Sequence, residues 1–151
     1  MNKLILSLVV CLAVASLLGS QRAEGFQKKI VTAAQVNGTW RYRGNIFRIW
    51  ALGQQKLKIE FEGTYEYKGP MGPGANLGFG EGIAQIDGAT AIFKPSGLPE
   101  DDDCKITMRF TGGKLVVDQI GICGFGHNVY ANGSYRRTSR AKPKFGESMP
   151  E

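Results

Sequence analysis

Residues that could support acid–base or nucleophilic chemistry are few in this sequence of 151 residues. His127 is the only histidine, and it lies in a glycine-rich stretch, 124–128. A nucleophilic serine or cysteine needs a base beside it, and no serine motif accompanies His127. The carboxylates Glu60, Glu62 and Glu66 alternate with apolar residues, which is typical of the solvent face of a strand. We therefore expect no catalytic residues and no enzyme activity.

A run of four acidic residues, 100–103, comes nearest to a metal site. Ca²⁺ binds several carboxylate oxygens at once. Four adjacent side chains cannot all converge on one ion, however, and the sequence lacks the ligand spacing of an EF-hand loop. We interpret the run as a solvated loop and expect no bound metal and no cofactor.

Two cysteines, Cys104 and Cys123, remain once the apolar N-terminal segment that contains Cys11 is set aside. In an exported protein, two cysteines are most simply joined in one disulfide. Neither a Cys-x-x-Cys motif nor a pair of histidines indicates a metal instead. Between the cysteines, the sequence Gly-Gly-Lys at 112–114 predicts the turn of a β-hairpin.

Two different residue pairs could form the two-residue loop of this hairpin, and each gives a different strand register. If Gly-Lys forms the loop, Cys104 faces Cys123 and Met108 faces Gln119. If Gly-Gly forms the loop, the pairing shifts by two residues and Cys104 faces Gly121 instead. Because a disulfide requires Cα atoms within about 7 Å of each other, it favours the first register. That register also turns Gln119 inward.

The N-terminus has the pattern of a secretory signal peptide. Lys3 precedes an apolar run, 4–18, that is broken only by two serines. The run is shorter than the ~20 apolar residues of a membrane span, so we expect a protein that is secreted or periplasmic after cleavage and does not span the membrane. The predicted organisation is a signal peptide at 1–25, a lead-in at 26–36, a β-barrel domain at 37–139 and a flexible basic tail at 140–151.

Alternation of apolar and polar residues predicts successive strands and no long helix. A closed meander removes exposed sheet edges, so we predict an all-β, eight-stranded antiparallel up-and-down barrel, with a two-sheet β-sandwich as the alternative. The proline- and glycine-rich segment 69–76 is expected to be the longest loop. Strands are expected at 39–43, 46–52, 56–68, 77–86, 90–94 and 104–111, then a strand returning to Cys123, and finally 129–137.

A three-residue loop at 53–55 would join two of these strands in a definite register. It pairs Phe47 with Phe61 and points both rings inward. Trp50 is then left on the outer surface, where it either belongs to a partner-binding patch or lies beneath one of the terminal segments.

Two short motifs carry a resemblance to known families. Residues 38–40, Gly-Thr-Trp, resemble the first strand of lipocalins and of avidin-type proteins, and residues 63–66, Gly-Thr-Tyr-Glu, are similar to the second avidin strand. The resemblance implies a calycin-like barrel. The later tryptophans that wall an avidin biotin site have no counterparts here, so it does not extend to biotin. The segment 123–135 looks like small uncharacterised exported bacterial proteins, which implies location alone.

The first functional hypothesis is a non-enzymatic binding module that holds a small, mostly apolar ligand inside the barrel. A barrel of eight strands is just wide enough for side chains or one small ligand. The polar groups of Gln119 and of two tyrosines would orient such a ligand. The residues expected to line the site are Trp40, Phe61, Tyr65, Tyr67, Met108 and Gln119.

The alternative hypothesis is an inhibitor-like or interaction module that binds an envelope protein through its loops and surface. The formal net charge is +6, and basic residues crowd the C-terminal segment, so an anionic surface is a further expected partner. No aromatic platform accompanies them, and we therefore do not expect nucleic-acid binding. The surface patch predicted for this function consists of Trp50, Arg136 and Arg137.

Overall fold

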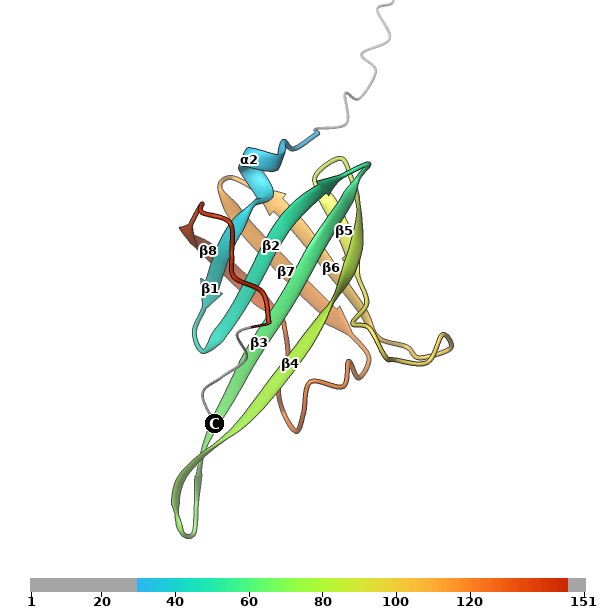
Figure 1. Cartoon of the computed structure of the whole chain (residues 1–151). Coiled ribbons are helices and arrows are strands. Elements are labelled where there is room, and N and C mark those ends of the chain that lie inside the picture. The colour runs from blue at the N-terminus through green and yellow to red at the C-terminus, as the bar shows by residue number, and fades with distance from the viewer. Residues whose placement is uncertain (1–29, 147–151) are drawn as a thin grey trace, which may run out of the picture.

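The computed structural model describes residues 30–146 and shows one antiparallel sheet that closes into a barrel. Its elements are α2 (Ala33–Val36), β1 (Gly38–Tyr42), β2 (Asn45–Gly53), β3 (Lys56–Gly69), β4 (Gly72–Asp87), β5 (Thr90–Phe93), β6 (Lys105–Thr111), β7 (Lys114–Ile120) and β8 (Gly133–Ser139). Each strand pairs with the next, and β8 pairs with β1 (Figure 1). The predicted eight-stranded up-and-down barrel is confirmed, and the alternative sandwich is not formed.

The predicted signal peptide, 1–25, lies outside the described residues, as does the first part of the lead-in. The rest of the lead-in contains α2, which rests on one end of the barrel (Figure 1). No helix within 30–146 has the length and apolar character needed to cross a membrane.

The register of β2 and β3 is the one that the 53–55 loop predicts, with Phe47 opposite Phe61. The register of β6 and β7 differs from the prediction by two residues, so that Met108 lies opposite Val117. The reason is the turn, in which Gly112 and Gly113 both have positive φ angles, 56° and 73°, as a type I′ loop requires. Glycine is the residue that adopts this backbone at no steric cost.

The disulfide between Cys104 and Cys123 forms in spite of this register, with an S–S distance of 2.03 Å and a Cα–Cα distance of 4.9 Å. Strand β7 ends at Ile120, and Gly121 has a φ of 74°. This left-handed residue lets the chain leave the strand, so Cys123 returns to Cys104 from outside the ladder. The expected disulfide is therefore correct, and the register inferred from it was wrong.

Two predicted boundaries also change. The segment 69–76 is not a long loop, because pairing continues to Gly69 opposite Gly72. Pro73, which has no N–H, is tolerated because β4 has no strand on its other side here. The last strand begins at Gly133 and not at residue 129, since Val129 instead packs against the core with 4% of its surface exposed.

Large apolar side chains fill the middle of the barrel. The Phe47 ring lies 4.8 Å from that of Phe61 and 5.1 Å from that of Tyr135, measured between ring centroids. All three side chains are completely buried. Towards the end that α2 covers, the Trp40 indole meets Phe110 edge to face at 5.9 Å. Contacts of this kind add to the free energy of burying the rings.

The segment between β7 and β8, residues 121–132, closes the other end of the barrel and is called the connecting loop below (Figure 1). Its Phe125 is buried, and its ring lies tilted against that of Phe61 with centroids 4.4 Å apart. Inward-facing glycines of β4 make room for it: a Cβ atom on Gly78 would overlap the Phe125 carbonyl oxygen, and one on Gly80 would overlap the Phe125 ring. The connecting loop thus fills the space that these glycines leave.

Residues 140–146 lie across the outer face of β2 and β3 (Figure 1) and are called the C-terminal strap. The Gly146 amide donates a hydrogen bond to Glu60 Oε2 at 2.7 Å, and Glu60 is completely buried. The Lys58 ammonium lies 4.6 Å from the centroid of the Phe145 ring. These contacts hold residues 140–146, which the sequence predicted to be flexible, against the barrel. They also cover Glu60, so the prediction that Glu60 lies on a solvated face was wrong.

Candidate functional site

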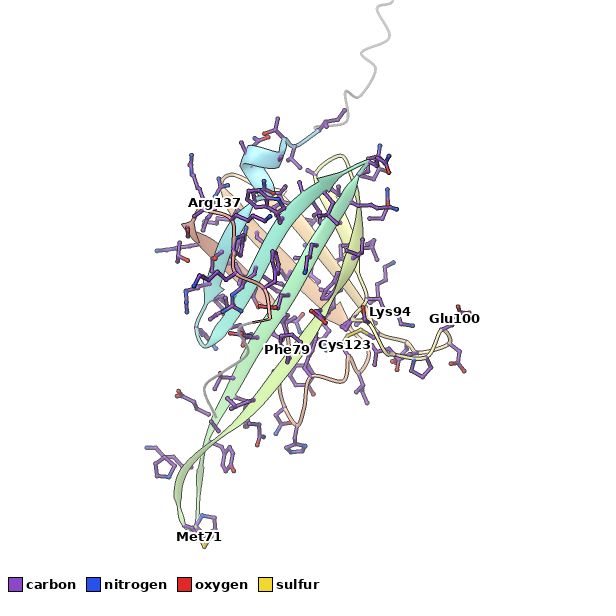
Figure 2. The ribbon with its side chains drawn as sticks, in the orientation of Figure 1. Met71, Phe79, Lys94, Glu100, Cys123 and Arg137 are labelled. Carbon is purple, nitrogen blue, oxygen red and sulfur yellow. A yellow bond between two sulfur atoms is a disulfide. The ribbon has the colours of Figure 1, made fainter. Side chains whose placement is uncertain are left out.

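The most unusual element is the far part of the β3–β4 hairpin, residues 63–78, called the hairpin extension below. Pairing between β2 and β3 ends with Ile46 opposite Glu62, whereas β3 and β4 stay paired for several more residues. The extension is therefore a two-stranded ribbon that projects past the end of the barrel (Figure 1). Figure 2 shows Met71 at its tip.

Tyr65 and Tyr67 lie on this ribbon, and this corrects their predicted place in the barrel interior. The alternation that points Phe61 inward continues through both tyrosines, but the barrel wall has ended at this level. Tyr65 is 40% exposed and Tyr67 is 44% exposed. Their rings stack with centroids 6.4 Å apart and planes inclined by 22°.

The Tyr67 ring lies across the strand over Gly74, its pairing partner on β4. An aromatic ring that covers a cross-strand glycine steadies a thin ribbon. An open groove of about 720 Å³ runs beside it. The groove is lined by Glu66, Tyr67, Lys68, Pro73, Gly74 and Ala75.

The connecting loop supports the base of the extension. The Asn76 side chain donates a hydrogen bond to the His127 carbonyl oxygen at 2.8 Å, and the backbone of β4 passes against Phe125. His127 is exposed and its carbonyl group serves this contact, as expected of a loop residue. These contacts hold the base of the hairpin extension against the end of the barrel, so the exposed side chains of the ribbon have a defined position relative to the barrel.

Exposed apolar side chains gather at this end of the molecule. Met71 at the tip is fully exposed. The sequence-based prediction gave these exposed side chains no role, and it placed a loop at 69–76, although the alternation within 72–76 could have indicated that the strand begins earlier. The others on the extension, on β4 beside it and on the connecting loop are Leu77, Phe79, Ile122 and Tyr130.

Three predicted ligand-binding residues, Trp40, Phe61 and Met108, do point into the barrel, where each is at most 1% exposed. Their contacts are with other parts of the protein. The Trp40 Nε1 atom donates to the Val36 carbonyl oxygen at 3.0 Å, and the ring of Phe61 is packed between those of Phe47 and Phe125.

Gln119 also faces inward, since a shift of two residues keeps it on the same face of β7. Its Oε1 atom accepts a hydrogen bond from the Ala131 amide at 2.8 Å, and its Nε2 atom donates to the Gly121 carbonyl at 3.2 Å. Both ends of the amide therefore hold the connecting loop in place. Gln119 is thus a polar side chain on the inward face, as predicted, and backbone groups of the connecting loop satisfy its hydrogen bonds.

The three residues of the predicted surface patch have separate environments. Trp50 lies under the C-terminal strap, with Lys142 Nζ 5.7 Å from its ring centroid. Arg137 donates to the carbonyl oxygens of Ala34 and Asn37 at 2.6 and 3.2 Å and so anchors α2. Arg136 alone remains exposed on the outer surface. The structure does not bring the three together as one patch.

Charged side chains under the strap form one cluster, in which Glu60 is buried and Arg48 and Glu62 are partly exposed. Arg48 Nη1 lies 2.8 Å from Glu60 Oε1 and 2.7 Å from Glu62 Oε1. Burial by itself lowers the pKa of Arg48, but hydrogen bonding and attraction to Glu62 and Glu60 raise it overall. The guanidinium therefore stays charged, and the cluster lies on the outer face of a sheet and not in a cleft.

The acidic run is part of a loop organised by Lys94. Its ammonium group donates to the carbonyl oxygens of Pro99, Glu100 and Asp102 at 2.7 to 3.2 Å. The carboxylate of Asp102 accepts from the Cys104 amide at 2.7 Å. Within 30–146, no group of three or more His, Cys, Asp or Glu side chains has the arrangement of a metal site.

Comparison of the chain with protein-family models, with curated proteins and with solved structures gives no match. The closed eight-stranded antiparallel barrel is compatible with a calycin-like fold.

Proposed function

We propose that this protein is an exported, non-enzymatic module that binds another protein of the cell envelope through the hairpin extension. The observation that carries the proposal is the pair of exposed, stacked tyrosines on a ribbon that leaves the barrel. Tyrosine is among the residues that dominate protein–protein binding energy. A calycin-like origin belongs to the same proposal and is supported by the closed barrel.

The disulfide between Cys104 and Cys123 supports export, because such bonds persist in oxidising compartments. An ordered ribbon also suits binding, since little conformational entropy is lost when a supported surface meets its partner. The two tyrosines would pack against an apolar surface of that partner, and the charges of Glu66 and Lys68 beside the groove would fix the orientation.

The hypothesis of a small apolar ligand inside the barrel stays a prediction. Packing around Phe61 and the backbone partners of Gln119 favour the surface function instead. Native mass spectrometry of the purified mature protein distinguishes the two functions, because a ligand in the barrel adds a discrete mass that survives gentle ionisation.

The experiment that tests the proposal is capture of partners from envelope extract by the tagged mature protein. The variant Tyr65→Ser/Tyr67→Ser is compared with Leu52→Ser/Ile92→Ser, which removes exposed apolar side chains elsewhere. A partner identified by mass spectrometry is then purified and titrated. We expect the tyrosine variant to bind about thirtyfold more weakly or worse, and the control variant to bind as the parent does.

Equal partner sets and equal affinities for the parent and the tyrosine variant, with both proteins folded by circular dichroism, would exclude the hairpin extension as the binding surface. Weaker binding by both variants would show that general surface hydrophobicity drives the capture.

A further inference from the structure

The seam where the barrel closes carries positive charges in direct register. Arg41 of β1 lies opposite Arg136 of β8, and Arg136 lies opposite Lys114 of β7. All three side chains are exposed on the outer face. They are called the basic row below. Sequence reasoning missed Arg41 and Lys114 because only closure of the barrel brings them beside Arg136.

The charges of the basic row are close together, and no described carboxylate pairs with them. Neighbouring strands are about 4.8 Å apart, so the three positions span about 10 Å of the surface. Like charges directly opposite each other destabilise a sheet. In the part of the chain that the structure describes, none of the three forms an ion pair with a carboxylate. Asp118, the one acid on β7, pairs with Arg109 of β6.

Further positive charge surrounds the row. Lys114, Arg136 and Arg140 line an open depression of about 520 Å³ beside the turn at 112–113. Burial lowers the pKa of Arg137, and the positive charge of Arg140 lowers it further. Strands β1 and β8 contain no acidic residue. Within residues 30–146, the seam therefore carries an excess of positive charge.

We propose that the basic row, together with Arg140, binds the phosphate groups of anionic lipid headgroups at a membrane surface. The charges are spread over three rigid strands and face outward from a shallow depression, which suits an array of headgroups better than one enclosed small anion. Near an anionic membrane, each basic residue strengthens binding by about fivefold. This surface differs from the hairpin extension and does not depend on the protein partner proposed above.

The test is cosedimentation of the mature protein with vesicles of phosphatidylglycerol and phosphatidylcholine, and with vesicles of phosphatidylcholine alone. The variant Arg41→Gln/Lys114→Gln/Arg136→Gln removes the basic row. The matched control, Lys56→Gln/Lys68→Gln/Lys105→Gln, removes the same charge from exposed positions on other strands. Ionic strength is held near 0.1 M, where charges more than about 10 Å apart are largely screened.

We expect the parent to bind the anionic vesicles and to leave phosphatidylcholine vesicles unbound. The partition coefficient should fall by about a hundredfold in the basic-row variant and by less than about fivefold in the control. The basic-row variant should also melt at the parent temperature or above, because like charges no longer face each other. Its capture of protein partners should be unchanged.

Equal losses in the two triple variants would show that net charge alone attracts the protein, and would overturn the proposal. Failure of the parent to sediment with anionic vesicles would overturn it as well. A third arm titrates inorganic phosphate and follows Arg41 and Arg136 side-chain resonances by NMR. Saturation by free phosphate without vesicle binding would assign the seam to a small anion and contradict a membrane role.

Discussion

Tyr135 lies completely buried in the core of the barrel. Its hydroxyl group donates a hydrogen bond to the Ala131 carbonyl at 2.8 Å, and its ring packs against Phe47 and Tyr42. Burial raises the pKa of Tyr135 well above its ordinary value, because a phenolate has no solvation there. The same residue thus fills the core and tethers the connecting loop.

This raised pKa predicts a loss of stability in alkali. Below about pH 10, Tyr135 is neutral in both the folded and the unfolded states. As the pH rises above about 10, the unfolded state releases a proton that the folded state retains, so the free energy of unfolding falls by about 1.4 kcal/mol per pH unit from this residue. Urea unfolding at about pH 8 and about pH 11 measures the fall.

Tyr135→Phe is the control for that prediction. It should be less stable than the parent by about 1 kcal/mol at pH 8, because the hydrogen bond to Ala131 is lost. Between the two pH values its stability should fall less than that of the parent. An equal fall in both proteins would mean that other groups cause the alkaline sensitivity.

Among the elements, the connecting loop depends on glycines of a different strand. Gly78→Ala would bring a Cβ atom into the Phe125 carbonyl oxygen, which is backbone and cannot rotate away. We expect a loss of about 2 to 3 kcal/mol in the free energy of unfolding, as for other overpacked sites. Urea unfolding at neutral pH measures it.

Gly69→Ala is the matched control on the partner strand. Its added Cβ would lie 3.5 Å from the nearest atom outside its immediate neighbours, the Gly72 carbonyl oxygen, which is an ordinary contact. The change should stay within about 0.5 kcal/mol. If Gly78→Ala were as mild as this control, the connecting loop would not be held against β4 in solution.

Strand-level predictions succeeded where one face of a strand is buried and the loop is unambiguous. Alternation along β3, together with the loop at 53–55, specified the pairing of Phe47 with Phe61. The β6–β7 register could not be obtained in this way, because its true turn satisfies the disulfide only through the left-handed backbone of Gly121. A local conformation at one glycine outweighed an argument based on a straight ladder.

The candidate site was less predictable for a related reason. Alternation gives the face on which Tyr65 and Tyr67 lie, but it does not say where the neighbouring strand ends. β2 stops pairing opposite Glu62, so both tyrosines fall beyond the barrel wall. Likewise, Trp50 could be placed on the outer surface from its position in the strand, whereas its contact with Lys142 depends on the path of the strap.

At the scale of the whole molecule, the C-terminal strap covers a face that would otherwise expose Trp50 and the charged side chains of Arg48 and Glu60 more fully. A protein ending at Ser139 loses the Gly146 hydrogen bond to Glu60. Because hydrogen bonds to charged groups contribute about 1.5 to 3 kcal/mol, we expect a loss of stability of about that size. The folded protein should also show red-shifted tryptophan fluorescence.

A protein ending at Gly146 is the control for this truncation, because it keeps every described contact of the strap. It should match the protein that extends to Glu151 in stability and fluorescence. Trp40 is buried inside the barrel and supplies a signal that neither truncation should shift. Identical spectra and stabilities for all three proteins would contradict a covering role for the strap.

Closure of the sheet between β1 and β8 also determines when the protein can finish folding. Thr138 Oγ1 of β8 bonds to the Thr39 carbonyl of β1, 99 residues earlier in the chain. Contacts between such distant segments form slowly, because the intervening chain must be ordered first. Until the last strand has emerged from the machinery that makes or exports the chain, β1 and β7 both have unpaired edges. Such edges are prone to aggregation, and we therefore expect the last strand to limit the yield of soluble protein.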